Sequence, residues 1–281
     1  MVNAFHPETL SKALEILAEN PCTIMAGGTD LMAQKARGFA IRPVFEHPLL
    51  FINHIDELKQ ISLEDNEIHI GACATLSELL ESQLIADTFK DVIRQMASPP
   101  IRNLATIGGN ICNASPAADT LPYLYALDAQ VEIQSQTGLR TLPIREFIKA
   151  PKTNGLQNNE LLTHIVLPNK EFDINFYRKL GQRRGMSLTK ASFHGLANVT
   201  NGSVTDLCLA LGSVAPTIVR CELTEQLLIG QSFINIEEIL PTVLNKYSEI
   251  IKPIDDARST AKYRKEVSIR LIKNFLLGLG K

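Results

Sequence analysis

The sequence lacks several features that define common classes of protein. It has no tryptophan, and its five cysteines are scattered without a CxxC spacing: Cys22, Cys73, Cys112, Cys208 and Cys221. Iron–sulfur clusters and structural zinc sites need grouped ligands, and the six histidines are not grouped either, so we expect no metal site. We expect the cysteines to be free thiols in a reducing compartment.

Long apolar runs and an excess of positive charge are also missing. The longest uncharged apolar stretch, residues 207–219, is interrupted by Gly212 and Pro216 and is too short to span a bilayer. A formal net charge of -2 offers no basic face, which argues against a nucleic-acid partner. Residues 1–7 lack the basic and apolar regions of a secretory signal, so we expect a cytoplasmic protein without a membrane span.

The length of 281 residues is enough for one large or two ordinary domains. Apolar residues spaced by three and four predict a helix over residues 7–20, and a Thr-x-x-Glu capping box opens another at Thr75. Residues 175–210 predict an antiparallel meander with a turn at Asn201-Gly202, and two helices follow over residues 236–279. We therefore place a domain boundary at about residue 171, before an α+β domain.

Two glycine loops carry most of the information in the chain. The first is Ala26-Gly27-Gly28-Thr29-Asp30-Leu31, and the second is Ala105-Thr106-Ile107-Gly108-Gly109-Asn110. Glycine lets backbone N–H groups approach a ligand closely, and neither loop contains Lys or Arg. The pair predicts a diphosphate site built from neutral donors, although a plain turn remains the alternative for the first loop.

The residues after the second loop are small and polar. Residues 110–119 predict a long segment without regular structure, and such segments inside compact domains are usually functional. The first loop has neither the third glycine of the dinucleotide fingerprint GxGxxG nor the lysine of a phosphate-binding P-loop. Neither of these common nucleotide-binding folds is indicated.

Taken together, these motifs resemble the FAD-binding subunit of the molybdenum hydroxylases. This group includes the medium subunits of bacterial xanthine dehydrogenase and carbon monoxide dehydrogenase. The resemblance rests on residues 26–30 (AGGTD) paired with residues 101–111 (IRNLATIGGNI), and on residues 213–217 (SVAPT) with Arg220 behind them. It covers essentially the whole chain, in order.

The resemblance implies an α+β fold with two domains. Residues 1–170 would form an FAD-binding domain of the vanillyl-alcohol-oxidase type, with one subdomain wound around a few parallel strands and one mainly antiparallel. Residues 171–281 would form a small α+β domain with an antiparallel sheet and helices.

The resemblance also implies which residues bind the cofactor. The amides of residues 27–30 would donate to the FAD diphosphate. Residues of the second loop would bind the diphosphate and the neighbouring sugar from the other side. The implied set is Ile24, Met25, Ala26, Gly27, Gly28, Thr29, Asp30, Leu31, Ala97, Thr106, Gly109, Asn110, Asp119, Leu162 and Lys179.

Three implied roles have simpler alternatives. Asp119 would accept a hydrogen bond from a sugar or ribityl hydroxyl, but it is also placed to cap a helix. Lys179 would lie near the flavin and stabilise its anionic reduced form, but it is also a plausible solvated strand lysine. Asp30 would lie on the diphosphate, but it is also placed as an acidic residue at a helix start. Leu162 would pack near the adenine and Ala97 near the cofactor.

The implied function is that of the flavoprotein subunit of a xanthine dehydrogenase-type enzyme. Its partners would be a molybdopterin-binding subunit, where the substrate is oxidised, and a [2Fe-2S] subunit. This chain would supply no catalytic residue and would pass electrons to NAD or another acceptor. Ser187, where the family often has an Asp, leaves the acceptor open.

Three alternatives to this function stay open. The first is a medium subunit of the carbon monoxide or aldehyde dehydrogenase type. The second is a self-sufficient FAD-dependent oxidoreductase, and the third is an assembly subunit that has lost its flavin.

Overall fold

The computed structural model describes residues 4–38, 41–183 and 185–280. The chain divides into two compact units, here named unit 1 and unit 2. Unit 1 contains the described residues up to Ile85, Ala97–Ala114 and Ala129–Asn169. Unit 2 contains Ala86–Met96, Ser115–Asp128 and the described residues from Lys170 onward. The chain thus passes between the units several times, and for the last time at residues 169–170.

Unit 1 begins with a small parallel sheet of order β1-β3-β2. Its strands are β1 (Ala4–Phe5), β2 (Thr23–Met25) and β3 (Leu49–Phe51). Helix α1 (Leu10–Glu19) begins where Thr9 accepts a hydrogen bond from the Lys12 N–H. The predicted apolar stripe of α1 is buried in the core with Leu50. Helix α2 (Leu31–Lys35) follows the first glycine loop.

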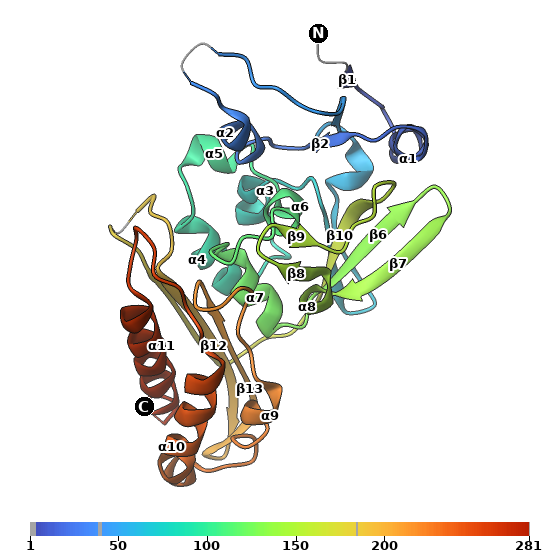
Figure 1. Ribbon diagram of the computed structural model, residues 1–281. Helices are drawn as coiled ribbons and strands as arrows, with labels where there is room; N and C mark the ends of the chain where they lie inside the picture. Colours follow the sequence, from blue (N-terminus) through green and yellow to red (C-terminus); the bar gives the residue numbers. More distant parts are fainter. Residues whose placement is uncertain (1–3, 39–40, 184, 281) are drawn as a thin grey trace. The chain divides into compact units, whose positions relative to one another are not determined.

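The second sheet of unit 1 is antiparallel throughout, with the order β4-β5-β10-β6-β7. Its strands are β4 (Ile61–Glu64), β5 (Glu67–Gly71), β6 (Gln130–Ser135), β7 (Gly138–Pro143) and β10 (Leu161–Pro168). Figure 1 shows β6 and β7 as a long hairpin beside β10. The presence of one parallel and one antiparallel sheet confirms the two-subdomain fold that the resemblance implies.

Short elements complete unit 1. They are α3 (Leu76–Glu81), α5 (Pro99–Arg102), α6 (Ile107–Cys112), α8 (Ile144–Phe147), β8 (Ile148–Ala150), β9 (Thr153–Asn154) and a 3-10 helix at Asp56–Leu58. The capping box at Thr75 is present as predicted. The prediction that residues 110–119 lack regular structure is wrong at its start, because Thr106 caps α6 and so starts a helix through both glycines.

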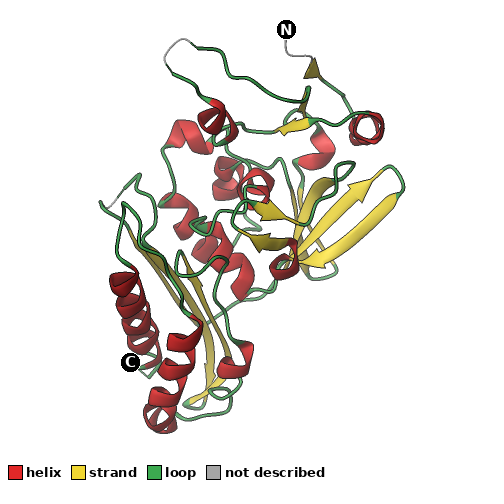
Figure 2. Ribbon diagram, in the orientation of Figure 1, coloured by secondary structure: helices red, strands yellow, loops and turns green. Residues whose placement is uncertain are grey.

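Unit 2 is built on an antiparallel sheet of order β11-β12-β13, with helices on both faces (Figures 1 and 2). The strands are β11 (Ile174–Leu180), β12 (Ala191–Thr200) and β13 (Ser203–Gly212), and the helices are α4 (Asp87–Arg94), α7 (Thr120–Ala126), α9 (Glu222–Glu225), α10 (Phe233–Ile250) and α11 (Ala261–Leu276). Both residues of the predicted turn, Asn201 and Gly202, have positive φ angles, of 51° and 77°. Such angles are those of a tight hairpin turn.

Alternation along β12 sends successive side chains to opposite faces of this sheet. Phe193 packs edge-on against Phe275 of α11, with ring centroids 5.6 Å apart. His194 contacts Tyr123 of α7, with ring centroids 5.2 Å apart. The sheet is therefore buried on both faces, as a three-layer arrangement requires. Among the described residues, no helix is both long and apolar enough to cross a membrane.

Candidate cofactor site

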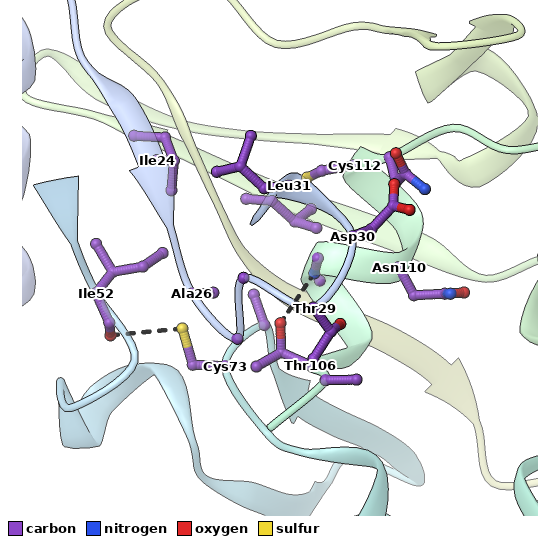
Figure 3. Close-up of a pocket in the computed structure, with 18 of the residues that line it drawn as sticks. Ile24, Ala26, Thr29, Asp30, Leu31, Ile52, Cys73, Thr106, Asn110 and Cys112 are labelled. Carbon is purple, nitrogen blue, oxygen red and sulfur yellow. Dashed lines mark hydrogen bonds between the residues drawn. The ribbon is translucent and has the colours of Figure 1, made fainter. Parts of the chain in front are cut away.

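A cavity of about 380 Å³ in unit 1 is lined by both glycine loops (Figure 3). Its wall includes the residues between β2 and α2, the start of α6 and the first residues of β10. The predicted site residues that line it are Ile24, Ala26, Gly27, Gly28, Thr29, Asp30, Leu31, Thr106, Gly109, Asn110 and Leu162. Residues more than 130 positions apart in the sequence thus meet at one cavity.

The first loop presents backbone donors to this cavity. Within the described residues, the backbone N–H groups of residues 27–30 donate no hydrogen bond. Gly28 has a φ angle of 66°, which L side chains rarely adopt. Because no acceptor in the described residues takes these four donors, they are available to an anionic ligand.

The second loop uses its amides inside the protein. The Gly108 N–H donates to Ala72 O at 2.9 Å, and the Gly109 N–H donates to Thr106 Oγ1 at 3.1 Å, drawn dashed in Figure 3. The Asn110 N–H donates to Thr106 O at 3.0 Å. These hydrogen bonds belong to the first turn of α6 and its attachment to the protein. The second loop therefore offers side chains and open space to the cavity, and these amides are not available to a ligand. The two loops therefore contribute differently, whereas the sequence predicted similar roles.

Close backbone packing explains the glycines. A Cβ on Gly27 would lie 1.8 Å from Leu104 O, so only glycine lets the first loop approach the residues before the second. A Cβ on Gly108 would lie 2.6 Å from Ala72. A Cβ on Gly109 would meet only the Thr106 hydroxyl, at 2.8 Å, and otherwise enters open space. Gly27 and Gly108 are thus needed for packing, while Gly109 keeps the surface of α6 free.

Apolar side chains form the rest of the wall. A register shift in β10 between Leu162 and His164 interrupts the alternation of that strand. The consecutive residues Leu161 and Leu162, which precede this shift, both line the cavity, together with Ile24. No Lys or Arg is present among the described residues that line it. Free amides beside apolar walls suit a diphosphate joined to flat ring systems, so the residues present fit FAD.

Four polar side chains at this site form a network that the sequence did not reveal. Gln34 Nε2 donates to Asp30 and, at 3.1 Å, to Asn113 Oδ1. Lys152 Nζ lies 2.6 Å from Asn113 Oδ1 and 3.4 Å from Asp30 Oδ2. Asn113, three residues after Asn110, was detectable from its spacing, but nothing in the sequence places Lys152 near either loop.

Two predicted residues of unit 1 are not part of this lining. Met25, at the end of β2, is buried and lines a second cavity of about 480 Å³, which Gly27 and Gly28 also line. Ala97 has a φ angle of 46°, and its carbonyl accepts a hydrogen bond from Arg102 Nη1 at 3.3 Å. Left-handed backbone at an alanine is uncommon and marks a constrained position.

In unit 2, Asp119 and Lys179 form a buried ion pair. Lys179 Nζ lies 2.6 Å from Asp119 Oδ2, and the Thr189 hydroxyl donates to Asp119 Oδ1 at 2.5 Å. Lys179 also donates to Gln95 O at 3.1 Å. Burial raises the pKa of Asp119, and the Lys179 ammonium opposes that rise.

The contacts of this pair bear on the simpler alternatives for Asp119 and Lys179. Asp119 stands at the N-cap position of α7 as the cap alternative predicts, but its side chain makes no capping hydrogen bond and pairs with Lys179 instead. The Lys179 side chain is only 8% exposed, so it is not a solvated strand lysine. Its ammonium has three protons and donates to two acceptors in the described residues, which leaves one donor available.

The described residues contain no group of three or more His, Cys, Asp or Glu side chains able to hold a metal. All five cysteines are free. Burial raises the pKa values of Cys73 and Cys112, which line the cavity, to about 12. Both thiols are therefore protonated at neutral pH and serve as part of the apolar wall.

Comparison with known proteins places this chain in a family. Residues 1–170 match the family model described as the FAD binding domain in molybdopterin dehydrogenase. Residues 176–279 match the model described as the CO dehydrogenase flavoprotein C-terminal domain. The two matches follow each other along the chain, in the order that the sequence motifs indicated.

Individual relatives agree with these models. The xanthine dehydrogenase FAD-binding subunit of Escherichia coli O157:H7 is 33% identical over 225 residues, which cover 78% of this chain and 76% of that protein. The carbon monoxide dehydrogenase medium chain of Hydrogenophaga pseudoflava is 27% identical over 276 residues, covering 96% of this chain and 94% of the relative.

Solved structures show the same fold. Carbon monoxide dehydrogenase from Hydrogenophaga pseudoflava, in a form that lacks the Mo-pyranopterin moiety, superposes with a TM-score of 0.88 at 26% identity, covering 98% of this chain and 96% of that one. The chain therefore belongs to the FAD-binding family of the molybdopterin dehydrogenases, and it is an FAD-binding subunit of an oxidoreductase.

Proposed function

We propose that this chain is the flavoprotein subunit of a xanthine dehydrogenase-type molybdenum hydroxylase. It would receive electrons from a [2Fe-2S] subunit and pass them to NAD or another acceptor, while a molybdopterin-binding subunit oxidises the substrate. The observation that supports the cofactor role is the set of free amides at residues 27–30 on a cavity without a cationic side chain in its described lining. Resemblance to the E. coli subunit supports the xanthine dehydrogenase type.

In this proposal the residues of the cavity hold the cofactor by neutral contacts. The amides of residues 27–30 bind the diphosphate, and Thr106 offers its hydroxyl proton because its oxygen already accepts from Gly109. Leu162 and Ile24 provide apolar contact for a ring system. FAD, when bound, supplies the capacity to accept two electrons and release them to an acceptor. Residues 1–170 would carry this task, and residues 171–281 would complete the subunit.

Lys179 and Asp119 have a tuning role in the proposal. A buried ammonium favours negative charge nearby, so Lys179 would stabilise the anionic reduced flavin. It would thereby raise the reduction potential of the flavin. The Asp119 contact holds the lysine side chain in one position. Its second oxygen is held by Thr189, so the pair keeps a defined geometry without the cofactor.

The acceptor remains NAD or another molecule in this proposal. Ser187 Oγ donates to Arg183 O at 3.0 Å, and the Arg183 guanidinium donates to the carbonyls of Gly185 and Met186. These side chains therefore form hydrogen bonds within their own segment, and position 187 offers a hydroxyl in place of a carboxylate. A cytoplasmic location is part of the proposal and is supported by the five free cysteines.

A carbon monoxide or aldehyde dehydrogenase-type medium subunit is the second candidate. The structural similarity to the Hydrogenophaga pseudoflava carbon monoxide dehydrogenase favours it. Substrate selectivity would belong to the molybdopterin partner in either case, so the residues of this chain do not distinguish the two.

Co-purification from the native host tests the proposal. We expect the chain to be recovered with two further subunits, with molybdenum and iron in the complex and flavin on this chain. Oxidation of xanthine or carbon monoxide by that complex distinguishes the two candidates. A colourless chain that binds no added FAD, or one that oxidises a substrate without partners, would contradict the proposal.

A further inference from the structure

The carboxylate of Asp30 is an unfavourable neighbour for an anionic ligand. Asp30 lines the cavity, and its own backbone N–H is one of the four free donors of the first loop. A negative charge at this position repels any phosphate that the amides attract. Because no cationic side chain is present in the described lining, that repulsion must be offset from outside the lining.

Lys152 is the cation that reaches this carboxylate. Its ammonium lies 3.4 Å from Asp30 Oδ2 and 2.6 Å from Asn113 Oδ1. Gln34 Nε2 donates to the same two residues. Asp30, Gln34, Asn113 and Lys152 thus form a closed network that joins α2, the end of α6 and the turn between β8 and β9.

The backbone fixes Lys152 at this position. Its φ angle is 61°, in the left-handed region that few non-glycine residues adopt. Its N–H donates to Ala114 O at 2.9 Å, and Asn154 Nδ2 donates to Cys112 O at 2.8 Å. The β8–β9 hairpin is therefore tied to the end of α6 at the lysine itself and two residues after it, which constrains the backbone that carries this side chain.

We propose that Lys152 is the counter-charge of Asp30 and thereby allows a dianionic diphosphate to bind the amides of residues 27–30. The lysine acts through Asp30 and is a positioning residue. This inference rests on the proposed FAD-binding role of the cavity. Both side chains are about half exposed, so solvent screens the pair and the effect is modest.

The test measures FAD affinity of the full-length chain after its flavin has been stripped, by quenching of flavin fluorescence at low ionic strength. Lys152→Met keeps the aliphatic stem and removes the charge, and we expect about fivefold weaker FAD binding. Lys149→Met is the matched control, because Lys149 is exposed on β8, three residues earlier. The control should bind FAD as the wild type does.

A double variant distinguishes two possible roles of Lys152, which are to neutralise Asp30 or to contact the phosphate directly. The double variant Asp30→Asn with Lys152→Met removes both charges, and its FAD affinity should return to within about twofold of the wild type. Added salt should also reduce the difference in FAD affinity between Lys152→Met and the wild type, because it screens the exposed carboxylate of Asp30.

Two results would overturn the inference while leaving the proposed function intact. One is wild-type affinity in Lys152→Met, and the other is a double variant as weak as Lys152→Met alone. A wild-type chain that binds no FAD would instead overturn the proposed function, and this inference with it. If Lys152→Met does not fold, Lys152→Gln replaces it under the same criteria.

Discussion

The ammonium of Lys179 lies 2.6 Å from Asp119 Oδ2, and the two side chains are only 8% and 9% exposed. They come from β11 and the start of α7, 60 residues apart in the sequence. A buried pair of this kind is a poor source of net stability but is costly to break, because the remaining charge has no partner.

Lys179→Met should therefore lower the free energy of unfolding by about 3 kcal/mol, since Asp119 is left buried without its counter-ion. Urea denaturation monitored by circular dichroism measures the change. The double variant Asp119→Asn with Lys179→Met should recover most of the loss. Equal stability of the single variant and the wild type would mean that the pair is solvated in solution.

Gly27→Ala should destabilise unit 1 by about 2 kcal/mol and abolish FAD retention, because the new Cβ would lie 1.8 Å from Leu104 O and displace the loop. Flavin content after purification and thermal unfolding report the two effects. Gly155→Ala is the matched control, since its Cβ would meet Phe147 O at 3.4 Å, an ordinary contact. Retention of FAD by Gly27→Ala would contradict the loop geometry.

Gly109→Val should abolish flavin retention and leave the fold largely intact. The added side chain enters mostly open space and meets only Thr106 Oγ1, at 2.8 Å, so the cost to stability is small, about 1 kcal/mol. Titration with FAD and the circular dichroism spectrum provide the measurement. A variant that purifies with full flavin content would show that the second loop does not face the cofactor.

Stability should fall as the pH drops below about 6.5, in part because of His194. Complete burial lowers the pKa of His194 to about 3, so the folded protein keeps it neutral while the unfolded chain binds a proton near pH 6.5. The unfolded state therefore binds more protons over this range. The histidine alone should remove about 2.5 kcal/mol of stability between about pH 7.5 and about pH 4.5.

Comparing the wild type with His194→Gln isolates this contribution, because glutamine retains a polar group facing Asn175 Oδ1 and does not titrate. The variant should show a shallower loss of unfolding free energy with falling pH than the wild type. Identical slopes for His194→Gln and the wild type would mean that His194 is protonated in the folded state.

The sequence by itself determined the local elements and the family. The apolar stripe of α1, the Thr75 capping box and the Asn201-Gly202 turn depend on residues within a few positions of one another, so their patterns are readable along the chain. The glycine loops were readable for the same reason. The two loops contribute half of the described residues that line the cavity.

Only the tertiary structure decided how those residues are used. It shows that the amides of residues 27–30 are free while those of Gly108 and Gly109 are bonded within the protein. It also joins Lys152 to Asp30 across 122 residues. Such partnerships arise from the packing of distant segments, and no local pattern records them, because a hydrogen bond depends on position in space and not on spacing along the chain.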